Sequence, residues 1–224
     1  MASPGYRHEY KYPVSRGDCL MLKGRLEKFM DVDRHAAGGS YVIRSLYFDN
    51  YKDRALLEKA EGTNPRAKFR IRVYNGSDAV ITLEKKIKYR DLTQKHQARL
   101  TRAECDSILR GDTDWMIGDG RGLVAELYAR MKGESLRPKT LVEYTRFPFV
   151  YEPGNVRVTL DTDIRSGVYE TDLFAPYPLV PLGESDVLEV KYDRFLPDII
   201  STLISPVTRG RSSFSKYEVC RKFG

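Results

Sequence analysis

Charged side chains recur at every second position in several segments that alternate between polar and apolar residues. The pairs at a spacing of two are Glu9 and Lys11, Arg70 and Arg72, Glu84 and Lys86, and Glu189 and Lys191, and Arg157 and Asp161 form a further pair at a spacing of four with Thr159 between them. Side chains along a β-strand point to opposite faces in turn, so the two members of each pair project from the same face. Cations grouped in this way attract anions, and the largest effect is expected where several strands bring them together.

On one strand alone, such a face is more simply explained as the solvated side of a sheet. The repetition over many strands, with long cations and only an occasional carboxylate, favours a different arrangement. Amphipathic helices in the same chain need an apolar surface to cover, which places the charged faces inside a closed barrel. Burying unpaired cations is unfavourable unless the lumen also holds water and a polyanion. We therefore expect an α+β fold in which helices pack outside a closed antiparallel β-barrel, a tunnel with a charged lumen.

The strands and helices of this barrel are predicted from the spacing of apolar residues along the sequence and from the residues typical of turns. Strands are predicted at 6–14, 41–49, 66–74, 79–88, 139–151, 156–163, 167–171 and 186–192. A hairpin turn, Asn75 to Asp78, joins the third and fourth of these strands. Helices are predicted from the capping boxes Ser15/Asp18 and Thr101/Glu104, over 53–60, around 124–131 and after Pro197. The first helix should bury Cys19, Leu22, Leu26, Phe29 and Met30.

Composition narrows the class of protein. The 224 residues fit one domain, 1–224, and the formal charge of +7 favours an anionic partner such as nucleic acid, a membrane surface or a phosphate-rich small molecule. The three cysteines, Cys19, Cys105 and Cys220, are too far apart to suggest a disulfide framework or a zinc site. The chain shows no apolar run of signal-peptide or membrane-spanning length, so we expect a soluble cytoplasmic protein.

The ordered set of charged motifs resembles the triphosphate tunnel metalloenzyme (CYTH-like) superfamily, and within it the VTC-domain polyphosphate polymerases. The motifs are RHEYKY at 7–12, SLYFD at 45–49, KFRIR at 68–72, LEKK at 83–86, YTR at 144–146, RVTLD at 157–161, LEVKY at 188–192 and FSKY at 214–217. Each motif is weak by itself, whereas their joint order and spacing are specific. Together they extend from Tyr6 to about Lys216.

The resemblance implies a site and a reaction. Its phosphate-binding residues correspond to Lys11, Arg70, Arg72, Lys86, Lys95, Arg146, Arg157, Lys191, Ser215 and Lys216. The implied catalytic set is Lys11, Arg70, Arg72, Lys86, Arg146, Glu189 and Lys216, with Glu189 as the ligand of Mn²⁺ or Mg²⁺. The implied reaction moves the γ-phosphoryl group of ATP to a growing polyphosphate chain. Phosphoryl transfer of this kind depends mainly on alignment and electrostatic stabilisation.

Alternatives remain open at this point. A tunnel hydrolase of triphosphates or polyphosphate uses the same cations, but Arg7 replaces the first carboxylate of the hydrolytic motif, which favours the polymerase. A third possibility is a non-catalytic module that binds polyphosphate or inositol phosphates, against which the acidic Glu189 argues. Nucleic-acid binding fits the charge but not the alternation within strands. A membrane-protein partner is compatible with each of these functions, and the sequence does not identify one.

Several residues have two interpretations. Glu9 and Glu84 are each either a second metal ligand or a structural partner for nearby cations, whereas Asp161 is expected to form an ion pair with a luminal arginine. His8 faces away from Glu9 and Lys11 and should be a packed or surface histidine. Tyr47 and Asp49 are expected to support the lumen. The segment 210–213 (GRSS) lacks Walker spacing, and we reject a P-loop there.

Overall fold

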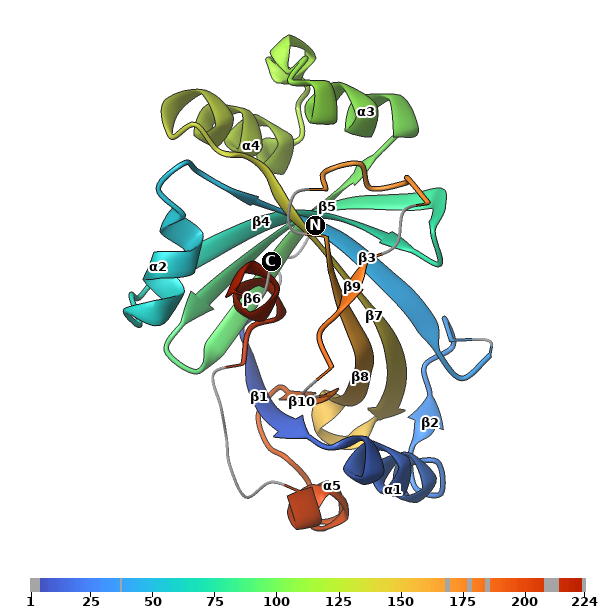
Figure 1. The fold of residues 1–224 in the computed structure, drawn as a ribbon. Coiled ribbons are helices and arrows are strands. Elements are labelled where there is room, and N and C mark those ends of the chain that lie inside the picture. Colours follow the sequence, from blue (N-terminus) through green and yellow to red (C-terminus); the bar gives the residue numbers. More distant parts are fainter. Residues whose placement is uncertain are drawn as a thin grey trace.

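Eight antiparallel strands within the described part of the chain form a sheet that closes into a barrel. The computed structural model describes residues 5–36, 38–167, 170–176, 179–183, 186–207 and 214–222. In sheet order the barrel strands are β7 (Arg137–Tyr151), β3 (Tyr41–Asp49), β4 (Arg66–Tyr74), β5 (Ser77–Tyr89), β6 (Leu92–Leu100), β1 (Arg7–Val14), β10 (Asp186–Tyr192) and β8 (Val156–Gly167). The pairing of β8 with β7 closes the ring, which confirms the predicted closed antiparallel β-barrel (Figure 1). Two short strands, β2 (Asp31–Val32) and β9 (Val180–Pro181), pair with β7 and β8.

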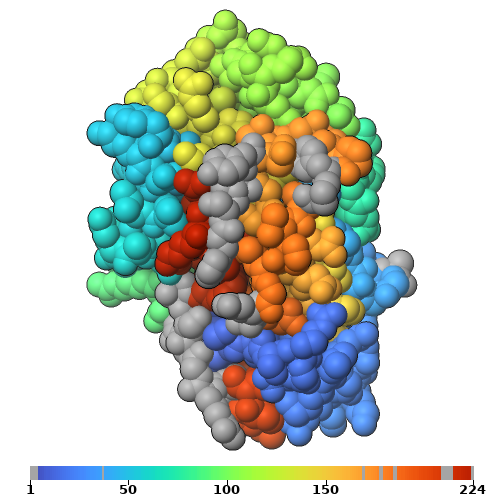
Figure 2. Space-filling model, in the orientation of Figure 1, coloured from blue at the N-terminus to red at the C-terminus, as the bar shows by residue number. Residues whose placement is uncertain are grey.

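Helices lie against opposite sides of this barrel, as Figure 1 shows. They are α1 (Arg16–Leu26), α2 (Arg54–Ala60), α3 (Arg102–Arg110), α4 (Gly122–Gly133), α5 (Asp198–Ile204) and α6 (Lys216–Lys222), and 3₁₀ turns lie at Asp114–Met116, Pro153–Asn155 and Ser205–Val207. The helices α3 and α4 cover one side, and α1 and α5 adjoin each other on the other side (Figures 1 and 2). No helix in the described segments is long and apolar enough to cross a membrane.

The outer face of the barrel is apolar, and the helices cover it. Ile71 of β4 and Leu83 of β5 are fully buried in one cluster with Ile108 of α3 and Leu127 of α4. Each such side chain contributes about 1.5–3 kcal/mol when it is fully removed from water. Because Ile71 and Leu83 point outward, the residues next to them in sequence point into the lumen. The parity predicted from the sequence is confirmed on these strands.

A second apolar cluster covers the opposite side of the barrel. Val158 of β8 and Leu188 of β10 pack with Leu22 of α1 and Ile200 of α5, and all four are buried. The helix α1 begins at the predicted capping box, in which Asp18 N donates to Ser15 Oγ over 3.1 Å. Such a cap stabilises a helix by about 1 kcal/mol.

The C-terminal helix α6 packs on a third cluster, which includes inward-facing residues of β3 and β7. Its Tyr217 is 1% exposed, stacks on Tyr47 at 5.1 Å between ring centroids and donates a hydrogen bond to Asp49 Oδ2 over 2.6 Å. Cys220 is also buried there, and its carbonyl accepts a hydrogen bond from Ser166. The contacts of Tyr217 and Cys220 together hold α6 against the barrel, and its first residue, Lys216, lies at the wall of the lumen.

Four predictions about local structure need correction or stay open. Phe29 is 51% exposed, because α1 ends at Leu26 and the following residues form turns. The segment 92–100 forms β6 although no strand was predicted there. The predicted strand 167–171 is wrong, since β8 continues through Gly167 while Glu170 and Thr171 lie outside any strand. The segment 210–213 falls outside the described residues.

Candidate active site in the barrel lumen

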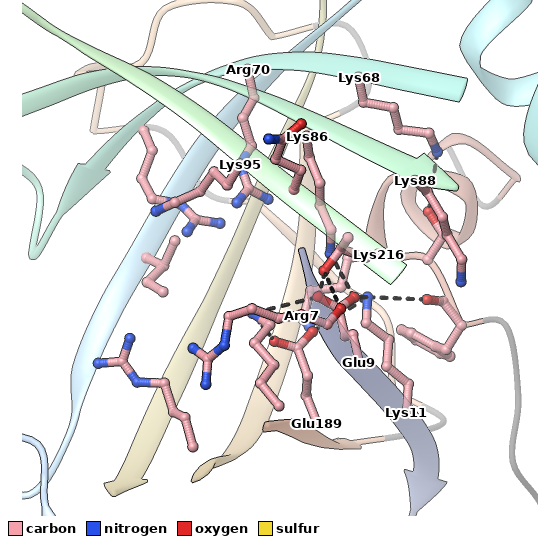
Figure 3. A pocket seen from close by; sticks show the side chains of 18 of the residues that line it. Arg7, Glu9, Lys11, Lys68, Arg70, Lys86, Lys88, Lys95, Glu189 and Lys216 are labelled. Atoms are coloured by element: carbon pink, nitrogen blue, oxygen red, sulfur yellow. Dashed lines mark hydrogen bonds and ion pairs between the residues drawn. The ribbon is translucent and has the colours of Figure 1, made fainter. Parts of the chain in front are cut away.

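The lumen contains a cavity of about 620 Å³ whose wall is strongly basic. Among the described residues, fourteen lysines and arginines line it, against the three acidic residues Glu9, Asp91 and Glu189. The cations are Arg7, Lys11, Lys59, Arg66, Lys68, Arg70, Arg72, Lys86, Lys88, Lys95, Arg146, Arg157, Lys191 and Lys216. Figure 3 shows many of these side chains converging from different strands. This excess of positive charge makes the cavity suited to a polyanion.

One group of charges forms where β1 and β10 pair. The register places Lys11 opposite Glu189 and Glu9 opposite Lys191. Lys191 Nζ lies 2.6 Å from Glu189 Oε1, and Lys11 Nζ lies 3.4 Å from a carboxylate oxygen of both Glu9 and Glu189. Lys86 reaches the same group from β5, with its Nζ 2.5 Å and 2.7 Å from the two oxygens of Glu9.

These cations keep both carboxylates ionised. Burial alone would raise the pKa of Glu189, but the ammonium groups of Lys191 and Lys11 outweigh it and hold that pKa well below its usual range. The pKa of Glu9 is also lowered against the effect of burial, mainly by Lys86. Glu189 is 4% exposed, and no hydrogen bond in the described structure reaches its Oε1 despite the nearby ammonium. The ionised carboxylate of Glu189 faces the cavity in an ion pair with Lys191, and a divalent metal ion bound with a phosphate could take the place of that ammonium group.

A second group is centred on Glu84 of β5. Arg70 Nε and Nη2 lie 2.8 Å and 2.6 Å from Glu84 Oε2, Arg72 Nη1 lies 3.6 Å from the same oxygen, and Lys95 Nζ lies 3.0 Å from Oε1. Burial opposes ionisation of Glu84, but Arg72 and Arg70 hold its pKa well below the usual range. Glu84 is therefore a structural partner of these cations, and it aligns the two arginines.

Hydroxyl groups orient the same two arginines. Arg70 donates to the Tyr47 hydroxyl over 2.8 Å, and Arg72 donates to Ser45 Oγ over 3.1 Å and to the Tyr144 hydroxyl over 3.2 Å. Both guanidinium groups are consequently held in place before any ligand binds. Tyr47 supports the lumen as predicted, whereas Asp49 lies away from the cavity and accepts hydrogen bonds from the backbone of Ala55 and from Tyr217.

A third group lies between β7, β8 and α6. Asp161 is fully buried, and its two oxygens accept hydrogen bonds from Arg146 Nε over 2.6 Å and from Arg146 Nη2 over 2.7 Å. Lys216 Nζ lies 2.5 Å from Asp161 Oδ2. Burial would raise the pKa of Asp161, but Arg146 and Lys216 lower it below the ordinary value. The predicted role of Asp161 as the partner of a luminal arginine is confirmed.

The cations at the rim of the cavity differ in how they are compensated. Arg157 forms an ion pair with the buried Asp33, and Arg7 forms one with Asp193 over 2.7 Å. Lys68 instead donates to the Ser215 hydroxyl over 3.4 Å, and burial followed by the charges of Lys11 and Arg66 lowers its pKa to about 8. His8 stacks on Tyr192 at 4.8 Å, which confirms a packed histidine.

Every site residue predicted from the sequence lines this one cavity: Lys11, Arg70, Arg72, Lys86, Lys95, Arg146, Arg157, Glu189, Lys191, Ser215 and Lys216. Their roles in phosphate binding and catalysis stay predictions. Arg66, Lys68 and Lys88 also line the cavity and were not predicted as site residues, although the alternation along their strands places Lys68 and Lys88 on the luminal face. Tyr41 and Tyr144 were not predicted either, because an aromatic residue in a strand gives no signal that separates lumen from core.

Two acidic residues of the lumen, Glu9 and Glu189, are placed where they could bind a divalent metal. The described residues contain no group of three or more His, Cys, Asp or Glu that could hold a metal ion. Glu189 and Glu9 both face the cavity and share the contacts of Lys11 and Lys191. Mg²⁺ is commonly held by one or two carboxylates together with water and substrate phosphates, so this donor set fits a metal that arrives with a phosphate ligand.

Comparison with known families agrees with this geometry. The family model of the VTC domain, which describes the sequences of that family, matches residues 6–223. This chain belongs to the VTC domain family. The family resemblance inferred from the charged motifs is thereby confirmed over nearly the whole chain. A search of curated proteins gives no match for this VTC domain.

Solved structures share the fold of this VTC domain. The PH1819 protein of Pyrococcus horikoshii OT3 aligns with a TM-score of 0.54 at 12% identity, over 97% of this chain and 99% of that chain. A Bacillus halodurans protein, named provisionally as an adenylate cyclase, aligns with a TM-score of 0.54 at 16% identity, over 94% of this chain and 95% of that chain. Identities this low show a common barrel fold and carry no further argument.

Proposed function

We propose that this VTC domain is a polyphosphate polymerase that transfers the γ-phosphoryl group of ATP to the end of a growing polyphosphate chain. The observation that carries the proposal is the cavity itself, in which a large excess of lysine and arginine surrounds the buried carboxylate Glu189. Glu84 and Asp161 each hold luminal arginines in position, whereas Glu189 and Glu9 lie together among lysines and face the cavity, where an acid repels phosphate. The acid is useful where a metal ion must also bind.

The arrangement of the cations supports phosphoryl transfer. In the transition state, negative charge is spread over the oxygens of the transferred group, and preorganised cations stabilise it without reorganising. Arg70 and Arg72 are fixed by Glu84 and by hydroxyl groups, and Arg146 is fixed by Asp161. Each can present its remaining N–H groups to phosphate oxygens, while Lys11 and Lys86 supply point charges.

Mn²⁺ or Mg²⁺ bound by Glu189, with Glu9 beside it, would supply Lewis-acid stabilisation of the phosphate oxygens. Until such an ion binds, Lys11 and Lys191 neutralise these carboxylates. The transfer needs no protein nucleophile, since the terminal oxygen of the acceptor chain attacks the γ-phosphorus of ATP directly while the bond from that phosphorus to the β–γ bridging oxygen breaks and ADP leaves. The protein then aligns donor and acceptor and restricts the access of water.

The position of Arg7 supports transfer to phosphate over hydrolysis. A carboxylate at this place would be able to orient an attacking water, whereas Arg7 is a cation bound to Asp193 and to the carbonyl of Asn155. The remaining carboxylate of the first strand, Glu9, is occupied by Lys86. We place the domain in the cytoplasm, where ATP is available. A membrane-protein partner that receives the product is compatible with this proposal.

The deciding experiment is incubation of the purified chain with ATP and Mn²⁺ or Mg²⁺, followed by gel separation of long phosphate chains and a parallel assay of free phosphate. A ladder of long chains that a chelator abolishes supports the polymerase. Release of phosphate without chains would show a hydrolase instead. Tight binding of triphosphate without turnover under any metal condition would show a binding module and refute both enzymatic functions.

A further inference from the structure

One edge of the cavity carries cations that lack, among the described residues, the carboxylate partners found elsewhere in the lumen. Arg66 of β4 lies opposite Lys88 of β5, and Lys68 lies opposite Lys86 one pair further in. In the described part of the chain, neither Arg66, Lys68 nor Lys88 lies within ion-pair distance of a carboxylate. Their nearest polar contacts are neutral, with Arg66 donating to the carbonyl of Thr63 and Lys68 to the hydroxyl of Ser215. Figure 3 shows Lys68 and Lys88 beside each other at one side of the pocket.

Within the part of the chain that the structure describes, this lack of compensation is specific to that edge. At the other rim, Arg157 is neutralised by Asp33 and Arg7 by Asp193. Deeper in the lumen Glu84 and Asp161 accept from the arginines. Burial is the largest cause that lowers the pKa of Lys68 and of Lys88, and the positive charges of Lys11 and Arg66 add to it, whereas Glu218 acts in the opposite direction on Lys68, and Glu9 and Asp91 do so on Lys88. Three half-buried cations are therefore left for a ligand to neutralise.

The length of the cationic row exceeds the length of a triphosphate. Arg72, Arg70, Lys68 and Arg66 alternate along β4 and all line the cavity. A strand rises about 3.3 Å per residue, so the row extends over about 20 Å. Three linked phosphorus atoms are too close together to reach both ends of this row. A triphosphate held by Arg70 and Arg72 would leave the Arg66 end free.

We propose that Arg66, Lys68 and Lys88 form a phosphate-binding extension of the site, which takes the phosphates of a chain longer than triphosphate. This inference rests on the proposed function and adds to it the direction in which the polyphosphate chain leaves the site. The polyphosphate chain leaves the Arg70 and Arg72 region along the paired strands β4 and β5 and passes Ser215. The extension makes the domain selective for long chains over triphosphate.

The test uses the double variant Lys68→Gln/Lys88→Gln, which removes two charges and keeps side-chain length. The matched control is Lys28→Gln/Lys52→Gln, which removes two exposed lysines that do not line the cavity. Binding of inorganic triphosphate and of a polyphosphate of several tens of units is measured without metal over a range of salt concentrations. We expect the first variant to lose about tenfold or more in affinity for the long chain, with a smaller salt dependence, and to bind triphosphate within about twofold of the native chain. The control should bind both ligands normally.

Failure of the extension can be distinguished from failure of the proposed function. Equal loss of affinity for triphosphate and for the long chain would overturn the extension, because the lysines would then belong to the triphosphate site. An unchanged affinity for the long chain, or a native chain that binds both ligands equally, would also overturn it while triphosphate binding stands. A native chain that binds neither ligand refutes the proposed function as well. If the double variant does not fold, the single variant Lys88→Gln answers the same question, since Lys88 is the more exposed lysine of the two.

Discussion

Replacing Asp161 with asparagine tests whether the luminal charges are arranged for a polyanion. Asparagine has nearly the same shape but carries no charge, so Arg146 and Lys216 lose the carboxylate that accepts from both of them over 2.5–2.7 Å. The nearest remaining carboxylate to Arg146 is that of Glu189, at 3.9 Å. Two buried cations would thus be left without full compensation.

The size of the effect follows from burial. Removing one partner of a buried ion pair costs about 3–5 kcal/mol, because the other partner stays buried and charged. For a domain of this length, each kcal/mol lowers Tm by about 2–4 °C, so we expect a decrease of roughly 6–20 °C. The matched control is Asp193→Asn, which breaks the partly exposed pair with Arg7 and should cost less than about 1 kcal/mol.

The assay is thermal unfolding of both variants with and without inorganic triphosphate, in the absence of metal. Triphosphate binds only the folded state, and its oxygens can replace the missing carboxylate beside Arg146 and Lys216. It should therefore raise Tm more in Asp161→Asn than in the native chain or the control. The reasoning would be refuted by a loss of stability no larger than that of Asp193→Asn. An identical triphosphate shift in all three proteins would refute the polyanion argument alone.

Further predictions concern the metal, the pH and the first helix. The Glu189→Gln variant should keep or improve its affinity for triphosphate without metal and lose metal-dependent turnover by orders of magnitude. The Arg72→Ala variant should weaken triphosphate binding and turnover together. Normal turnover in Glu189→Gln would exclude Glu189 as a metal ligand. Because the pKa of Lys68 is lowered to about 8, its positive charge is lost as pH rises through that value. The affinity for long polyphosphate should therefore decrease between pH 7 and 9, and it should decrease less in the Lys68→Gln variant. Binding titrations at several pH values and constant ionic strength measure this difference. Ser15→Ala removes the cap of α1 and should lower the free energy of unfolding by about 1 kcal/mol in urea without changing triphosphate affinity.

Much of the site followed from local sequence pattern. Alternation has a fixed period of two, so the apolar Ile71 between Arg70 and Arg72 was enough to place both arginines on the luminal face. The same reasoning placed Glu189 with Lys191. It failed for β6, where Gln94, Lys95, His96 and Gln97 follow one another, so that polar residues occur at successive positions and the contrast between the two faces is lost. It also failed at 167–171, because the long pairing of β8 with β7 carries one strand to Gly167.

The sequence by itself thus determined the strand faces, the helix caps and the family motifs, all of which depend on residues near one another in the chain. Only the tertiary structure decided which acid neutralises which base. Glu9 contacts Lys86, which is 77 residues away in the sequence, and Asp161 contacts Lys216, which is 55 residues away. These contacts depend on barrel closure and on the packing of α6. No local pattern encodes such contacts, because they are set by strand register and by the burial of Tyr217. For the same reason, the three cations at the Arg66 edge, which have no carboxylate partner among the described residues, became recognisable only from the other pairings in the lumen.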